Sequence, residues 1–150
     1  MTSLPITHAT LTTALGAGTA AHREAVAAGR SALRPCDFDD VVLPGWIGVV
    51  DGLETPTLPS ALARHDCRNN RLAWRGLPQD GFADAVSAAR QRWGAHRVAV
   101  LLGTSTSGIL STEQAYRRRG ADGALPADFR YAETHNTHSL AGFVREALGV

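Results

Sequence analysis

The apolar run Arg-Val-Ala-Val-Leu-Leu at residues 97–102 restricts the possible folds of this 150-residue chain more than any other segment. Its apolar residues do not alternate with polar ones, which is typical of a strand covered on both faces of a sheet. Such a strand needs neighbours at both edges, and a sheet usually holds about four to six strands. Only residues 5–15 and 46–50 also favour strands. Because three strands are too few, we expect part of the sheet to be missing from this chain.

Helical patterns separate and follow the predicted strands. The final pattern is the clearest, because its apolar residues recur at helical spacing and Gly149 follows as the expected C-terminal cap. That stripe consists of Leu140, Phe143, Val144, Ala147 and Leu148. Other helices are expected at residues 19–29, 62–77, 81–93 and 111–119. The alternation of strands and helices predicts the α/β fold class, with sheet and helices in layers.

The composition excludes several classes of function. The formal net charge is +1, so a concentrated basic face for nucleic acid or for an acidic membrane is not expected. Every basic residue other than histidine is arginine, which excludes mechanisms that need a lysine amine. Cys36 and Cys67 lack the spacing of a zinc knuckle or a redox pair. Because no leader-like or membrane-spanning segment is visible, the sequence predicts a cytoplasmic protein.

A loop bounded by glycines, residues 103–108, follows the apolar run. Gly103 and Gly108 have the spacing of a phosphate-binding P-loop, but the lysine and the hydroxyl residue that such a loop requires next are absent. The nucleophile elbow of hydrolases, G-x-S-x-G, is closed by a glycine, whereas Ser107 takes that final position here. The loop therefore matches neither motif.

Residues 16–21 fit the dinucleotide-binding pattern G-x-G-x-x-A between a predicted strand and a predicted helix. Gly16, Gly18 and Ala21 carry the match. The acidic residue required about 20 residues later has the candidates Asp37, Asp39 and Asp40. The preceding strand contains threonines and a histidine instead of a continuous apolar run, which disfavours this interpretation. A small dinucleotide-binding domain stays as an alternative.

Glu133, His135 and His138, near the start of the final helix, are residue types that zinc sites use. The two histidines are three residues apart instead of the four usual on a helix, and a third ligand is not obvious. Polar residues at a junction between loop and helix are the favoured interpretation.

Several phrases of the sequence, taken in order, resemble one known family. They are Thr-Ala-Leu-Gly at residues 13–16, Ala-Gly-Arg-Ser-Ala-Leu at residues 28–33, the strand and loop at residues 98–109, and Ala-Gly-Phe-Val-Arg-Glu-Ala-Leu-Gly at residues 141–149. Together they resemble the N-terminal half of the β-ketoacyl-acyl-carrier-protein synthases, the condensing enzymes of the thiolase superfamily. The resemblance covers nearly all of residues 1–150, more loosely at residues 37–61. Within the family it is nearest to synthases of aryl polyene or related polyketide clusters.

The resemblance implies a thiolase-like layered sheet and a decarboxylative Claisen condensation in fatty acid, aryl polyene or polyketide synthesis. In that family a cysteine accepts an acyl group from a carrier-protein thioester, and the carbanion formed from malonyl carrier protein attacks it. The nucleophile turn lies beyond Val150, and neither Cys36 nor Cys67 takes its place. We therefore expect no catalytic residue and no cofactor in this chain. Its expected partners are acyl carrier protein thioesters and the remainder of the synthase or a homologous subunit, in a dimer.

By the same resemblance, five residues are expected to line the acyl pocket: Gly103, Ser105, Thr106, Tyr131 and His135. Thr106 takes the place of a gating apolar side chain, and Tyr131 and His135 match positions near the acyl tunnel at the dimer interface. Polar or bulky groups there imply a short or unsaturated acyl group.

Two other interpretations stay open. In the first, the hydroxyls of residues 104–107 only satisfy backbone groups in a tight turn. In the second, the chain is a non-catalytic interaction module that pairs with a carrier protein or a synthase through an unfinished sheet edge.

Overall fold

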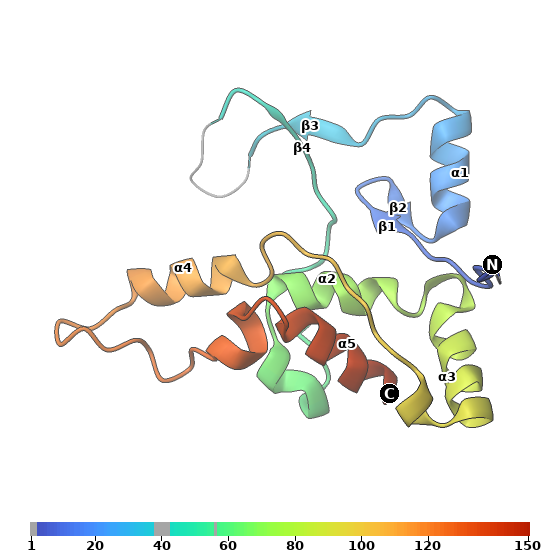
Figure 1. Cartoon of the computed structure of the whole chain (residues 1–150). Coiled ribbons are helices and arrows are strands. Elements are labelled where there is room, and N and C mark those ends of the chain that lie inside the picture. The colour runs from blue at the N-terminus through green and yellow to red at the C-terminus, as the bar shows by residue number, and fades with distance from the viewer. Residues whose placement is uncertain (1–2, 38–42, 56) are drawn as a thin grey trace.

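The computed structural model describes residues 3–37, 43–55 and 57–150, and within them the fold is mixed α/β (Figure 1). The α-helices are α1 (Thr19–Ala27), α2 (Arg68–Gly76), α3 (Phe82–Trp93), α4 (Ile109–Arg117) and α5 (Ser139–Leu148). Short 3-10 helices span Ser60–His65, Gln79–Gly81 and Ala95–Arg97, and a π-helical turn spans Tyr131–His135. None of the helices described here is long and apolar enough to cross a membrane.

The strands form two small antiparallel hairpins instead of one layered sheet. β1 (Thr12–Thr13) pairs with β2 (Gly16–Ala17), and β3 (Leu33–Pro35) pairs with β4 (Trp46–Gly48). The strand predicted at residues 46–50 is therefore confirmed over its first three residues. The strand predicted at residues 5–15 is wrong except for β1, because residues 3–10 have no strand partner in the described chain.

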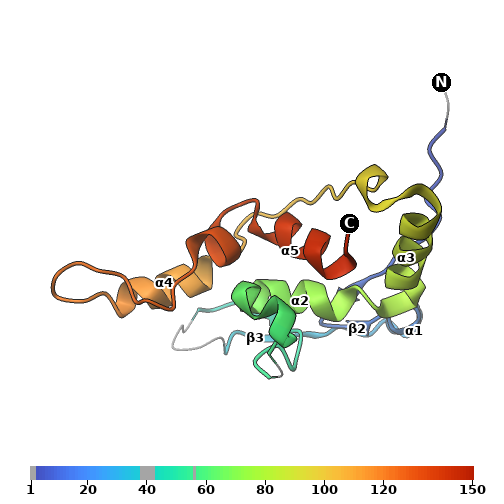
Figure 2. The same cartoon turned by 90° about the horizontal axis from the view of Figure 1, so that it is seen from below.

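Residues 97–102 do not form the predicted buried strand. Arg97 ends the 3-10 helix Ala95–Arg97, and residues 98–102 belong to no helix or strand. The side chains of Leu101 and Leu102 are 89% and 42% exposed, so the expected burial on both faces is also wrong. Figure 2 shows this segment as an extended trace between α3 and α4. A strand exists only through backbone bonds to a neighbour, and the described residues supply none here.

The hydrophobic core lies where α5 packs on α2 and on the 3-10 helix Ser60–His65. Phe143 is fully buried at its centre, with Leu140, Val144, Leu58 and Leu62 around it. The predicted apolar stripe of the final helix is thus confirmed as a core face, and Gly149 ends α5 in the left-handed conformation, as its cap position predicted.

The helix predicted at residues 62–77 is two helices with a break at Asp66. Asp66 has extended backbone angles, and its carboxylate accepts hydrogen bonds from the Arg71 guanidinium at 2.7 and 2.8 Å. Arg71 also donates to the carbonyl oxygens of Leu53 and Glu54. Arg71 therefore connects the break at Asp66 to the loop at Leu53 and Glu54. The helices predicted at residues 19–29, 81–93 and 111–119 are confirmed, and every boundary agrees within two residues.

Candidate functional site

The glycine-bounded loop lies on the surface over most of its length. Gly103, Ser105 and Thr106 are exposed. The Thr104 hydroxyl accepts a hydrogen bond from the backbone N–H of Ser107 at 3.2 Å. One hydroxyl of the loop thus has the backbone-satisfying role that the simpler interpretation predicted.

The end of the loop is fixed against the segment that leads into α5. Ser107 is only 7% exposed, and its Oγ lies 3.0 Å from Ser139 Oγ and 3.3 Å from the carbonyl oxygen of Asn136. A Cβ on Gly108 would overlap the carbonyl group of Thr134, so only glycine allows this close approach. The loop and the turn before α5, far apart in the sequence, therefore form one structural unit.

Tyr131 and His135 meet on the π-helical turn Tyr131–His135. Their ring centroids are 5.2 Å apart, and His135 Nδ1 is hydrogen-bonded to the Thr112 hydroxyl on α4. Tyr131 stays 57% exposed. A histidine beside a hydroxyl resembles a base and a nucleophile, but neither His135 nor Thr112 lines the apolar groove against α2, α3 and α5.

The five residues expected around an acyl pocket do not all converge. The structure brings Tyr131 and His135 together and joins their turn to the loop through Ser107 and Gly108. Thr106 instead lines a separate hollow of about 300 Å³ with Arg68 and Asn69 of α2. Gly103 and Ser105 line no pocket described here.

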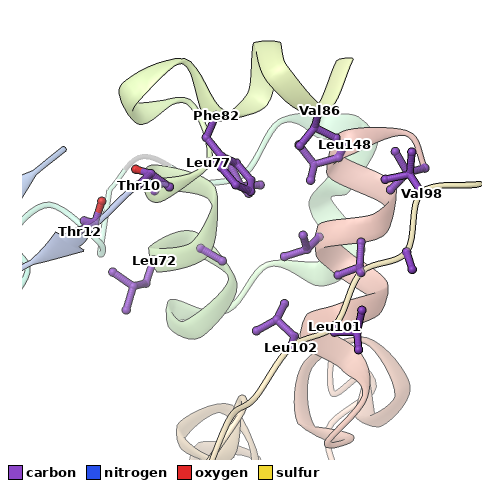
Figure 3. Close-up of a pocket in the computed structure, with 16 residues that line it drawn as sticks. Thr10, Thr12, Leu72, Leu77, Phe82, Val86, Val98, Leu101, Leu102 and Leu148 are labelled. Atoms are coloured by element: carbon purple, nitrogen blue, oxygen red, sulfur yellow. The ribbon is translucent and has the colours of Figure 1, made fainter. Parts of the chain in front are cut away.

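An apolar groove of about 460 Å³ lies against α2, α3 and α5, and the sequence did not predict it as a site. Figure 3 shows Thr10 and Thr12 on one side, Val98, Leu101 and Leu102 on the other, and apolar side chains of α2, α3 and α5 between them. Those side chains include Leu72, Leu77, Phe82, Val86, Val144 and Leu148. The groove therefore has a floor of helices. It is bounded on one side by residues 98–102, which belong to no sheet, and on the other by Thr10 and by Thr12 of the β1 hairpin strand.

Unsatisfied polar groups accompany this groove. The backbone groups of residues 99–102 make no hydrogen bond within the described chain. The Thr12 hydroxyl is buried and has no hydrogen-bond partner among the described residues. Buried polar groups are normally paired, so the Thr12 hydroxyl indicates that the groove is incomplete as it stands. The backbone groups of residues 99–102 are instead open to solvent and available to a partner strand.

The dinucleotide pattern serves a structural purpose in this fold. Gly16 lies in an antiparallel hairpin, where a Cβ would be 2.9 Å from Ala21 Cβ. The Asp80 carboxylate accepts hydrogen bonds from the backbone N–H and the hydroxyl of Thr19, at the N-terminus of α1. A pyrophosphate would need that same position, and it would meet a negative charge there. The geometry therefore disfavours the dinucleotide interpretation, although Asp39 and Asp40 lie outside the described residues.

The remaining cysteine, histidine and acidic side chains considered for catalysis or metal binding are either held by other residues or too far apart to act together. Burial raises the pKa of the Cys67 thiol, which keeps it in the protonated, unreactive form. His65 Nε2 lies 3.0 Å from Glu146 Oε2 in an ion-pair cluster with Arg64. Hydrogen bonding to His65 and the nearby Arg64 charge lower the pKa of Glu146. Over the described ranges, no three histidine, cysteine or acidic side chains, Glu133, His135 and His138 included, gather closely enough to hold a metal ion.

Sequence reasoning missed the groove, Ser107 and Asp80 for different reasons. The groove depends on residues from five segments, which only the folded chain brings together. Ser107 and Asp80 are the described non-glycine residues with positive φ. The Gln-Asp-Gly sequence at residues 79–81 is a turn signal that could have indicated Asp80, whereas nothing local distinguishes Ser107 from its neighbours.

The chain matches no protein-family model, no curated protein and no solved structure.

Proposed function

We propose that this chain is the N-terminal segment of a β-ketoacyl-acyl-carrier-protein synthase with a thiolase-like fold. It would supply part of the wall around the acyl group and depend on the remainder of the synthase for catalysis. The order of the motifs at residues 13–16, 28–33, 98–109 and 141–149 supports the family. The incomplete groove supports the dependence on further polypeptide.

The groove is the observation that carries the proposal. Its floor is apolar, as helices that cover a sheet must be, and its rim at residues 99–102 offers backbone groups without partners in the described chain. A β-strand laid on this floor would bond to that rim and place alternate side chains on Leu72 and Leu77. In the proposal, strands from the remainder of the synthase take this place and cover Leu101.

The division of chemistry follows from what the chain contains. A condensing enzyme needs a thiolate nucleophile and hydrogen-bond donors for the negative charge on the thioester oxygen. Cys67 is buried with a raised pKa, so it does not fit the first role. Both roles therefore belong to the remainder of the synthase. The loop at residues 103–108 would contact the acyl group, with Thr106 limiting its length.

Reconstitution tests the proposal. The chain is mixed with a second polypeptide that carries the cysteine turn and the histidines of a synthase of the same subgroup. We expect a stable complex and condensation of acyl and malonyl carrier-protein thioesters that needs both polypeptides. Leu101→Lys on the groove rim should abolish the complex, and Leu4→Lys, at a residue that is 93% exposed and outside the groove, should leave it intact.

Two outcomes would overturn the proposal. Condensation by the chain alone would show that the nucleophile lies within it. Failure of the two polypeptides to associate would remove the synthase as the partner of the groove. A complex that forms without condensing thioesters favours the non-catalytic interaction module instead.

A further inference from the structure

Ser107 has a backbone conformation that serine adopts only at a cost. Its φ is +46°, in the left-handed region that favours glycine. Glycines lie at both ends of this loop, yet the strained position holds a residue with a side chain. Such strain persists only where the surroundings impose it, and for Ser107 the contacts of its side chain are the candidate cause.

The hydrogen-bond partners of Ser107 determine where its proton points. The carbonyl oxygen of Asn136 can only accept, so the Ser107 hydroxyl donates to it across 3.3 Å. The Ser139 hydroxyl, 3.0 Å away, then donates to Ser107 Oγ. Asn136 also accepts from the backbone N–H of Ser139 at 2.8 Å. The Ser107 hydroxyl proton therefore points to the Asn136 carbonyl oxygen and to no base, so this serine is not an activated nucleophile.

These contacts join the loop to the N-terminus of α5, the helix that contributes Phe143 to the core. Ser139 is 5% exposed and is the first residue of α5, four positions before the fully buried Phe143. Ser105 and Thr106, in contrast, are exposed and make no hydrogen bond through their side chains within the described chain. The loop thus has a fixed end and a free tip.

We infer that Ser107 is a positioning residue, which uses Ser139 and the Asn136 carbonyl to set the shape of the loop tip that faces the acyl group. The part of this inference that concerns the acyl group rests on the proposed function. The part that concerns the loop does not, because the contacts lie entirely within this chain.

Four variants of the chain separate the hydroxyl from the backbone strain. Ser107→Ala removes the hydroxyl and keeps the strain, whereas Ser107→Gly removes both. Ser139→Ala removes only the donor to Ser107. Thr137→Ala is the matched control, because Thr137 is an exposed hydroxyl residue of the same turn for which the described chain provides no side-chain partner.

Amide hydrogen exchange of the chain alone is the first measurement. The reporters are the amides of Ser107 and Ile109, which bond to Thr104 and Thr106 within the loop. Loss of the hydroxyl contacts should raise their exchange about fivefold or more in Ser107→Ala, Ser107→Gly and Ser139→Ala. Exchange in the middle of α5 and the unfolding midpoint of Ser107→Gly should stay close to those of the parent chain. Thr137→Ala should change nothing.

Acyl-chain selectivity of the reconstituted synthase is the second measurement. We expect Ser107→Gly and Ser139→Ala to change the ratio of kcat/KM between a short and a long acyl carrier-protein substrate, with the larger effect on KM. A role in folding stability alone would lower the amount of active enzyme and leave that ratio unchanged.

The outcomes separate this inference from the proposed function. Unchanged loop exchange in Ser107→Gly and Ser139→Ala would overturn the inference, and so would raised exchange with unchanged selectivity. If the parent polypeptides do not condense thioesters at all while the loop exchange rises as expected, the proposed function fails and the positioning role within the loop stands.

Discussion

At the scale of single residues, Asp80 joins two parts of the chain that are 61 positions apart. α1 begins after Gly18, which has no side chain to cap the helix. The Asp80 carboxylate takes the place of that cap by accepting hydrogen bonds of 3.0 Å from the Thr19 N–H and 2.8 Å from the Thr19 hydroxyl. Asp80 holds this position with a positive φ, so the contact has a conformational cost.

Replacement of Asp80 by asparagine tests this cap. The Asp80→Asn side chain tolerates the positive φ but loses the charge, so we expect faster amide exchange at Thr19 and Ala20 and little change elsewhere.

The hydrogen bonds from Thr19 lower the pKa of Asp80 in the folded chain. The stabilisation is therefore complete above the usual carboxyl pKa of about 4 and is lost as the pH falls through the lower, folded value. The difference between Asp80→Asn and the parent should accordingly vanish in strong acid. Glu113→Gln removes an exposed carboxylate with no partner in the described chain, and it should leave the amide exchange at Thr19 and Ala20 unchanged.

Arg71 is a second residue whose contacts cross between segments. Its guanidinium forms a bidentate salt bridge with the Asp66 carboxylate, and the two side chains are 19% and 20% exposed. Arg71→Lys keeps the charge but cannot reproduce the fork or the bonds to Leu53 and Glu54. We expect the free energy of unfolding to fall by about 1–3 kcal/mol in urea titrations at pH 7.

The pH dependence of the Arg71→Lys effect is a further check. Hydrogen bonds from Arg71 lower the pKa of Asp66, so the bridge stabilises the fold above the usual carboxyl pKa and weakens as the pH falls through the folded value. Arg75→Lys is the control, because Arg75 lies one turn further along α2 and its side chain donates a hydrogen bond only to the Asp51 carbonyl among the described residues. An equal loss of stability in both variants would contradict the special role of the fork.

At the scale of elements, the apolar stripe of α5 supplies three of the five buried residues of the core cluster described here. Phe143 is fully buried between α2 and the 3-10 helix Ser60–His65, and its ring lies 5.7 Å from that of His65. Phe143→Ala would leave a cavity there and should lower the free energy of unfolding by about 3–5 kcal/mol in denaturant titrations. Leu4→Ala, at a side chain that is 93% exposed, should change it by less than about 0.5 kcal/mol. Similar effects of the two substitutions would place the core elsewhere.

The elements that the sequence predicts well are those with local causes. The helices α1, α3 and α5 each have apolar residues at helical spacing and a glycine after the last turn, and these two signals locate them. Such local signals suffice because a helix forms its backbone hydrogen bonds within its own segment. A strand needs a partner that its own sequence does not specify. Residues 97–102 have the composition of a buried strand and lack the partner, whereas β3 has an unremarkable sequence and pairs with β4.

The candidate site is predictable to the same extent. The glycines at residues 103 and 108 indicate a tight loop, and Gly108 does lie against another segment. That this segment is the turn before α5, and that Ser107 and Ser139 hold the two together, depends on contacts 32 positions apart. The groove depends on even more distant segments, so no local pattern could have located it.

At the scale of the whole molecule, the groove leaves apolar surface open to water. Leu101 and Leu102 are 89% and 42% exposed beside backbone groups that have no partner in the described chain. Lysines on an open edge strand prevent pairing with other chains, and here the chain has no lysine at all. An edge of this kind is a template for association until a partner covers it.

Self-association of the isolated chain should therefore depend on this edge. We expect the mean mass in sedimentation experiments to rise with concentration for the parent chain. In the double variant Leu101→Lys and Leu102→Lys it should stay at the monomer value, because two charges at the rim would be desolvated by pairing. The unfolding midpoint of the double variant should hardly change, since neither Leu101 nor Leu102 belongs to the described core cluster. Leu4→Lys and Ile6→Lys, at side chains that are 93% and 89% exposed outside the groove, form the matched control and should associate like the parent. If this control also became monomeric, association would result from general exposure of apolar side chains and not from the edge at residues 98–102.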